Sequence, residues 1–219
     1  MTEADDLTLD ELRIRLAPQI ALSAMFDGWS DAALVSAAEA EGVDVAVARL
    51  AFPGGAMDMI DAWVASIDER MEANFADGRL DNMPIRERIR SLVWFRLEAI
   101  EGLEESLARA MSIQAMPKNA PAALKQGWSS ADKMWRLAGD TATDYNHYTK
   151  RAILGSIYGA TLAVWKSDES EDKANTAAFL DRRIEGVMKF EKAKAKWLGK
   201  DREHFDMARF LGRLRYPQK

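Results

Sequence analysis

The residues best suited to chemistry lie in one short segment, Trp135–Arg151, which reads WRLAGDTATDYNHYTKR. His147 follows Asp144 by three positions, so on a helix the two side chains lie one turn apart. A carboxylate beside an imidazole can orient a general base or help to hold a metal ion. The sequence favours a simpler interpretation, in which the two groups form a hydrogen bond at the start of a helix.

The remaining sequence offers few catalytic partners for this pair. Cysteine is absent, which excludes disulfides, thiolate catalysis and cysteine-ligated metals and fits a reducing compartment. A single Asp-x-x-His pair cannot build a carboxylate-bridged di-iron site, which needs repeated pairs. Phosphate-binding glycine loops and the G-x-S-x-G turn are missing. We therefore predict no catalytic residue, no metal and no cofactor, although a Ser-His-Asp arrangement stays open.

The same segment also interleaves aromatic and charged side chains at a junction between two helices. Exposed aromatic residues among charges mark a docking surface more often than a core. The segment therefore predicts a surface that binds a partner. The residues concerned are Trp135, Tyr145, His147 and Tyr148, with Asp140, Asp144, Lys150 and Arg151 beside them.

Apolar residues recur at helical spacing along almost the whole chain, which predicts an all-α protein. Cap residues such as Ser30 and Asp44, and breaks at Gly28, Gly42 and Pro117, separate the helices. The longer helices suit a bundle with an interior pocket. The expected helices are 9–26, 31–41, 45–51, 56–75, 85–110, 122–137, 144–165, 175–196 and 201–215.

The three short helices at the start of the chain have the spacing of a helix-turn-helix unit. Residues 28–60, however, carry five acidic residues and only one basic residue, Arg49. A recognition helix gains much of its affinity from basic residues near the phosphates. We therefore predict the architecture of a DNA-binding unit without nucleic-acid binding.

Large aromatic and methionine side chains are concentrated on the later, longer helices. Such side chains suit an elongated apolar cavity, although the pattern alone favours an ordinary core. If a cavity exists, the candidate residues that line it are Trp94, Met111, Trp128, Trp135, Tyr158 and Trp165.

The end of the chain differs in charge from the rest. Residues 187–219 carry ten basic and four acidic residues, which gives them a net charge of +6. Because the whole chain has a net charge of −5, residues 1–186 have a net charge of −11. A basic amphipathic helix is typical of a peripheral membrane anchor, and the alternative is a terminal helix that docks on its own bundle or on a second subunit. The candidate membrane-binding residues are Met207, Phe210, Leu211 and Leu214 on one face, with Arg209 and Arg213 on others.

Two further patterns bear on location. No stretch approaches the roughly 20 apolar residues that span a bilayer. The first fifteen residues are acidic, unlike a secretory or mitochondrial targeting signal. We therefore expect a bacterial cytoplasmic protein that binds peripherally to the inner membrane. If the chain is a processed mitochondrial protein, we expect it on the matrix side of the mitochondrial inner membrane.

Beyond these patterns, Met134–Leu154 resembles the signature of the ubiquinone-biosynthesis accessory family, the ninth member of the coenzyme Q set. The segments Ala178–Lys192 and Phe52–Gly55 are also similar, and the resemblance covers about residues 16–196. It implies a TetR-like fold, a homodimer and a non-enzymatic protein that binds phospholipid or an isoprenoid quinone in the cavity of its bundle. The six candidate cavity residues given above are then the candidate lipid-binding residues. It also implies a membrane surface and a demethoxyquinone hydroxylase as partners.

The resemblance further assigns a docking patch for the hydroxylase. The positions that match are Met134, Leu137, Asp144 and Tyr148, followed by His147, where the family often has tryptophan. The resulting domains are 1–55, helix-turn-helix-like, 56–198, a lipid-binding bundle, and 199–219, a basic amphipathic helix. The competing hypotheses are a ligand-responsive transcriptional regulator of the TetR type and an enzyme that uses Asp144 and His147.

Overall fold

The structure is a computed structural model that describes residues 7–141 and 145–198. Within these ranges the chain forms helices and turns and no strand, as the helical periodicity predicts. The predicted last helix, its six membrane-binding residues and Asp144 lie outside the described residues. The helices are α1 (Leu9–Asp27), α2 (Asp31–Ala40), α3 (Val45–Ala51), α4 (Ala56–Asn74), α5 (Ile85–Glu98), α6 (Glu104–Gln114), α7 (Ala120–Leu137), α8 (Tyr145–Trp165), the short 3-10 helix η2 (Glu171–Lys173) and α9 (Ala174–Leu198).

Side-chain caps define the starts of the first three helices. Ser30 and Asp44 accept hydrogen bonds from backbone N–H groups at the starts of α2 and α3, as predicted. Thr8 forms a reciprocal capping box with Glu11 at the start of α1. Gly28 ends α1 with a φ of 68°, a conformation that glycine adopts without strain.

The single helix predicted for residues 85–110 is wrong, because the chain turns between α5 and α6. Gly102 has a φ of 77° in this turn. Tertiary contacts then hold α6 in its new direction. The Trp29 indole donates to the Ser106 carbonyl at 3.0 Å, and the Ser106 hydroxyl donates to the Ala21 carbonyl at 2.6 Å. These bonds to α1 and its following turn override a continuous apolar pattern along residues 85–110.

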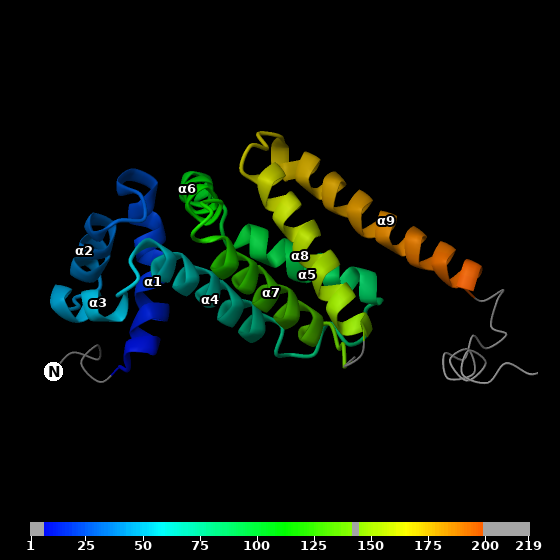
Figure 1. Ribbon diagram of the computed structural model, residues 1–219, viewed down its shortest axis with the longest axis horizontal. Coiled ribbons are helices and arrows are strands. Elements are labelled where there is room, and N and C mark those ends of the chain that lie inside the picture. Colours follow the sequence, from blue (N-terminus) through cyan, green and yellow to red (C-terminus); the bar gives the residue numbers. More distant parts are fainter. Residues whose placement is uncertain (1–6, 142–144, 199–219) are drawn as a thin grey trace, which may run out of the picture. The chain divides into compact units, whose positions relative to one another are not determined.

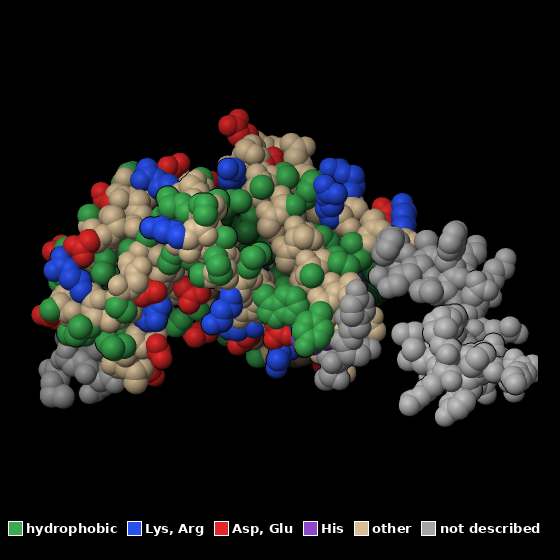
Figure 2. Space-filling model, viewed as in Figure 1, with side chains coloured by type: hydrophobic (Ala, Val, Ile, Leu, Met, Phe, Trp, Pro, Cys, Tyr) green, Lys and Arg blue, Asp and Glu red, His purple; other side chains and the backbone are tan. Residues whose placement is uncertain are grey.

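The first three helices form one cluster, and α4 leads from that cluster towards α5–α8 (Figure 1). Helix α1 packs against both α2 and α4, and the Trp29 and Trp63 rings lie 5.2 Å apart between centroids. Helices α7 and α8 pack against each other. On the face shown in Figure 2, apolar side chains gather over α6 and α7, whereas charges of both signs lie over α2 and α3.

Residues 1–180 form one compact unit, and residues 181–219 belong to a second. The first unit contains α1–α8 and the start of α9. None of the helices in the described part of the chain is both long and apolar enough to cross a membrane.

Candidate functional site

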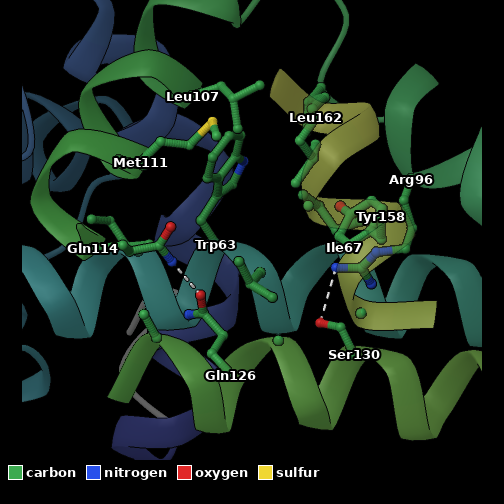
Figure 3. A pocket seen from close by; sticks show the side chains of 18 residues that line it. Trp63, Ile67, Arg96, Leu107, Met111, Gln114, Gln126, Ser130, Tyr158 and Leu162 are labelled. Atoms are coloured by element: carbon green, nitrogen blue, oxygen red, sulfur yellow. Dashed lines mark hydrogen bonds between the residues drawn. The ribbon is translucent and has the colours of Figure 1, made fainter. Parts of the chain in front are cut away.

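A pocket opens among α4, α5, α6, α7 and α8 in the first unit (Figure 3). Its volume is about 190 Å³, and its mouth is open. This is smaller than the range of about 300–1,000 Å³ that is usual for small-molecule sites, so a long ligand would extend through the mouth. Most of the wall is apolar, and the larger apolar side chains are Ile60, Trp63, Ile67, Leu107, Met111 and Leu162.

One side of the pocket is polar because it contains the buried side chain of Arg96. The guanidinium is 1% exposed and forms an ion pair with Asp68, which is also buried. Its Nη2 donates to the Ser130 hydroxyl at 3.1 Å, and the Tyr158 ring lies 4.9 Å from its Cζ. Among the described residues, the Nε–H of Arg96 has no hydrogen-bond acceptor.

Two glutamines form a second polar group in the pocket wall. The Gln114 amide donates to the Gln126 carbonyl, and the Gln126 amide donates to Asp61 at 3.1 Å. Figure 3 shows this glutamine pair on one side of the pocket and Arg96, Ser130 and Tyr158 on the other. A ligand that matches the pocket therefore has an apolar body and at least one polar end.

Three glycines of α7 and α8 leave room in the pocket wall. A Cβ at Gly155 would lie 3.8 Å from the Gly127 carbonyl and 3.9 Å from the Ala131 Cβ, so this glycine allows the two helices to approach closely. A Cβ at Gly127 or Gly159 would meet no heavy atom of the described chain within 4 Å. Gly159 lines the pocket and is exposed, so a large side chain there would add bulk at the open side of the pocket.

The six predicted lipid-binding residues occupy three different places. Met111 and Tyr158 line the pocket. Trp94 and Trp165 pack edge to face, 5.8 Å apart between centroids, outside the pocket lining. Trp128 and Trp135 lie on α7 near the start of α8, at the predicted docking surface.

The predicted docking residues also divide into buried and exposed members. Met134 is fully buried, Leu137 is partly buried, and Tyr148 is 61% exposed. The Trp128 ring lies 5.9 Å from that of Tyr148 and 6.4 Å from that of His147. Sequence reasoning placed Trp128 in a cavity, but the structure brings it into an aromatic cluster with His147 and Tyr148.

An ionic network fixes the junction between α7 and α8 beside this aromatic cluster. Arg151 is 2% exposed and forms ion pairs with both Asp132 and Asp140, and Lys150 lies 2.6 Å from Asp140. Burial acts to raise the pKa of Asp140, but the hydrogen bonds from Lys150 and Arg151 outweigh it, so the pKa falls below its usual value. The network therefore holds Asp140 ionised and ties the loop to both helices.

Arg96, Asp68 and Ser130 escaped the sequence analysis, although a signal for two of them was present. Arg96 continues the apolar stripe of Ile89, Leu92 and Val93 along α5, and Asp68 follows Ile67 on α4. Opposite charges on the buried faces of two helices predict a buried ion pair. Nothing in the sequence distinguishes Ser130 from other serines.

Comparisons with known proteins agree with the family resemblance of Met134–Leu154. The COQ9 family matches residues 120–191. The ubiquinone biosynthesis protein COQ9 of Rattus norvegicus is 32% identical over 74% of this chain and 54% of its own length. The Homo sapiens protein of the same name is 31% identical over 74% of this chain and 52% of its own length. That of Schizosaccharomyces pombe is 27% identical over 72% of this chain and 62% of its own length. The chain thus spans about half the length of the curated mammalian relatives it matches.

A solved structure supports the fold. The TetR transcriptional regulator of Nitrosomonas europaea superposes with a TM-score of 0.63 and 21% identity, over 80% of this chain and 96% of its own. At this identity the likeness shows the fold alone, and it confirms the predicted TetR-like architecture. Residues 120–191, which contain α7, α8 and most of α9, match the COQ9 family, and the chain as a whole has a fold like that of a TetR regulator.

Proposed function

We propose that this protein is a non-enzymatic, lipid-binding accessory protein of ubiquinone biosynthesis. It binds phospholipid or an isoprenoid quinone intermediate and presents the intermediate to a hydroxylase of the pathway. The observation that carries the proposal is the largely apolar pocket among α4–α8, part of it built from the helices that match COQ9. The relatives named above are ubiquinone biosynthesis proteins, which supports the choice of pathway.

The aromatic cluster of Trp128, His147 and Tyr148 is the surface that we propose binds the hydroxylase. Its support is the exposure of Tyr148 and the buried ionic network that holds α7 against α8. Exposed aromatic side chains on a rigid support are typical of protein-binding hot spots. We propose that Leu137 completes the patch and that Met134 supports it from below.

Contact with the membrane is the third part of the proposal, and it rests on the sequence of residues 199–219. Basic residues alternate there with an apolar helical face. The relatives carry the word mitochondrial in their names, which supports a position on the matrix side of the inner membrane. A bacterial source would place the protein on the cytoplasmic side instead. A homodimer also belongs to the proposal, through the likeness to a TetR regulator.

The direct test is mass spectrometry of gently purified protein. We expect co-purifying phospholipid or isoprenoid quinone in the wild-type protein and a large loss of it in Gly159→Leu, which adds an apolar side chain at the open side of the pocket. The control is Gly186→Leu, because a Cβ at this exposed helical glycine also meets no described atom within 4 Å but lies outside the pocket. Repeated recovery of lipid-free wild-type protein would contradict the proposal.

Replacement of His147 tests the docking surface against the alternative of an enzyme. Tryptophan at this position should preserve or strengthen binding to the hydroxylase, because a larger ring adds apolar contact area beside Trp128 and Tyr148. Pull-down with the hydroxylase and ubiquinone production in cells measure the two effects. Loss of ubiquinone with intact folding and intact hydroxylase binding would instead favour a catalytic His147.

A ligand-responsive transcriptional regulator is the alternative that the TetR likeness favours. The charges of the helix-turn-helix-like unit oppose it. Arg49, the one basic residue between 28 and 60, forms a bidentate ion pair with Asp31 rather than standing clear on α3. Electrophoretic retention of specific DNA that weakens with salt would revive this alternative, and we expect none.

A further inference from the structure

The polar side of the pocket offers a donor that the protein itself does not use. Arg96 is 1% exposed, and its Nε–H has no acceptor among the residues that the structure describes. A buried N–H without an acceptor destabilises a protein, so such groups are uncommon unless they serve a ligand or another function. Because Arg96 lines the pocket, an oxygen atom of a bound ligand is well placed to become its acceptor.

The charges around Arg96 determine which kind of acceptor fits. Asp68 already neutralises Arg96, and the second carboxylate oxygen of Asp68 lies 3.8 Å from the Lys133 ammonium, which in turn lies 3.5 Å from Glu72. The two positive and two negative charges of these groups sum to zero. A phosphate or carboxylate would add an unbalanced charge to this buried site, which costs desolvation energy without a free cation to offset it.

The neighbouring groups suit an uncharged, oxygen-bearing ring. Tyr158 covers the guanidinium and carries a hydroxyl that can donate or accept, and Ser130 holds Nη2 in place. The apolar residues beyond, such as Trp63 and Leu162, can hold an alkyl or isoprenoid tail. Resting on the proposed lipid-binding function, we propose that Arg96 and Tyr158 recognise an uncharged carbonyl or phenol oxygen, so the pocket prefers a quinone-type head to an anionic lipid head.

Three ligands with the same tail test this preference on the full-length protein: decylbenzoquinone, decylbenzene and decyl phosphate. We expect decylbenzoquinone to bind with a Kd about tenfold or more below those of the other two, as measured by equilibrium dialysis, because only its carbonyl completes a hydrogen bond to a charged donor without adding charge. Tighter binding of decyl phosphate would overturn the proposal.

The double variant Asp68→Asn with Arg96→Gln removes the buried charges together, which avoids leaving one of them unpaired. It should bind decylbenzoquinone about as weakly as decylbenzene, with the decylbenzene Kd unchanged. Tyr158→Phe keeps the ring over Arg96 and should weaken only the quinone, so it carries the test if the double variant does not fold. Unchanged quinone binding in both variants would overturn the proposal.

The variant Gly159→Leu distinguishes failure of this inference from failure of the lipid pocket. If the three ligands bind equally and Gly159→Leu abolishes the binding of all three, the proposed lipid pocket is supported and only the proposed head-group preference is contradicted. Absence of any binding would contradict both the lipid pocket and the head-group preference. Binding that Gly159→Leu does not alter, with Gly186→Leu behaving as wild type, would also contradict both.

Discussion

Arg151 connects two carboxylates at the α7–α8 junction through a nearly fully buried guanidinium. Asp132 comes from α7, Asp140 from the loop that follows it, and the same guanidinium also donates to the His147 carbonyl at 3.1 Å. One side chain therefore determines how α7, the loop and α8 meet. This makes Arg151 a supporting residue for the aromatic cluster, although it is not part of the exposed surface.

Replacement of Arg151 by methionine should destabilise the protein by roughly 3 kcal/mol or more, because it leaves two carboxylates without their buried partner. The measurement is the free energy of urea-induced unfolding. The control is Arg136→Gln. Arg136 also pairs with Asp132 but is 71% exposed, so its loss should change the stability by less than about 1 kcal/mol. Equal effects of the two variants would contradict a special role for Arg151.

Asp168 anchors the start of α9 within the first unit. It accepts hydrogen bonds from the Thr176 N–H at 2.7 Å and the Thr176 hydroxyl at 2.6 Å, and further ones from Ser170. Burial acts to raise the pKa of Asp168, but these hydrogen bonds outweigh it and hold the pKa well below its usual value. Ionised Asp168 therefore stabilises the fold.

The contribution of Asp168 to stability should depend on pH in a defined direction. Because its pKa is lower in the folded state, the stabilisation is complete above the unfolded pKa of about 3.9 and is lost as the pH falls towards the folded value. The difference in unfolding free energy between wild type and Asp168→Asn should shrink over that acid range. The control is Glu169→Gln at the exposed neighbouring position, which takes no part in these hydrogen bonds. A pH-independent difference for Asp168→Asn would contradict the mechanism.

At the scale of helices, the turn between α5 and α6 depends on Gly102. Its φ of 77° favours glycine, and a Cβ there would meet no described atom within 4 Å, so strain is the only expected cost. Gly102→Ala should lower the unfolding free energy by about 1 kcal/mol. Gly127→Ala, also open but helical, should raise it by about 0.5 kcal/mol. Stabilisation by Gly102→Ala in thermal unfolding would refute this account.

Local signals were sufficient to predict most helices. The starts at Asp31 and Val45 follow from Ser30 and Asp44, whose side chains act within their own turns. The break before α6 had one local signal, Gly102, but the hydrogen bonds between Ser106 and residues of the distant α1 segment, which hold α6 in its new direction, could not be predicted. The same limit explains Trp128. Its type suits a cavity or a surface equally, and only the packing of α7 on α8 decides between them.

The pocket was predicted as a class of site rather than as a set of residues. Met111 and Tyr158 were identified because large side chains on long helices favour a cavity. The pocket is also lined by Gly127, Gly155 and Gly159, which leave space because they have no side chain. Apolar periodicity depends on side chains, so it does not indicate these glycines. The Arg96–Asp68 pair joins residues 28 positions apart, so the sequence can place each on a buried helix face, but their contact depends on how α4 packs against α5.

At the scale of the whole molecule, the division between an acidic body and a basic end determines how the protein should meet a membrane. Arg209→Glu with Arg213→Glu should greatly reduce flotation with liposomes that contain anionic lipid, because each basic residue near such a surface contributes about 1 kcal/mol. The circular dichroism spectrum should remain unchanged.

A charge-matched control separates position from net charge. Lys118→Glu with Lys125→Glu makes the same change in charge at two exposed residues between α6 and α7 and on α7. This variant should float almost as well as wild type. Flotation that is unaffected by the arginine changes, or equally reduced by both pairs, would remove residues 199–219 from the account of membrane binding.

The pocket walls come from five consecutive helices, so a ligand held there binds only the folded chain. By mass action, such a ligand adds RT ln(1 + [L]/Kd) to the unfolding free energy, about 2.7 kcal/mol at a hundredfold excess over Kd. The melting temperature of a preparation should therefore record how much lipid it carries. Delipidation should lower the Tm of the wild-type protein and leave that of Gly159→Leu unchanged, which turns a routine stability measurement into an occupancy assay.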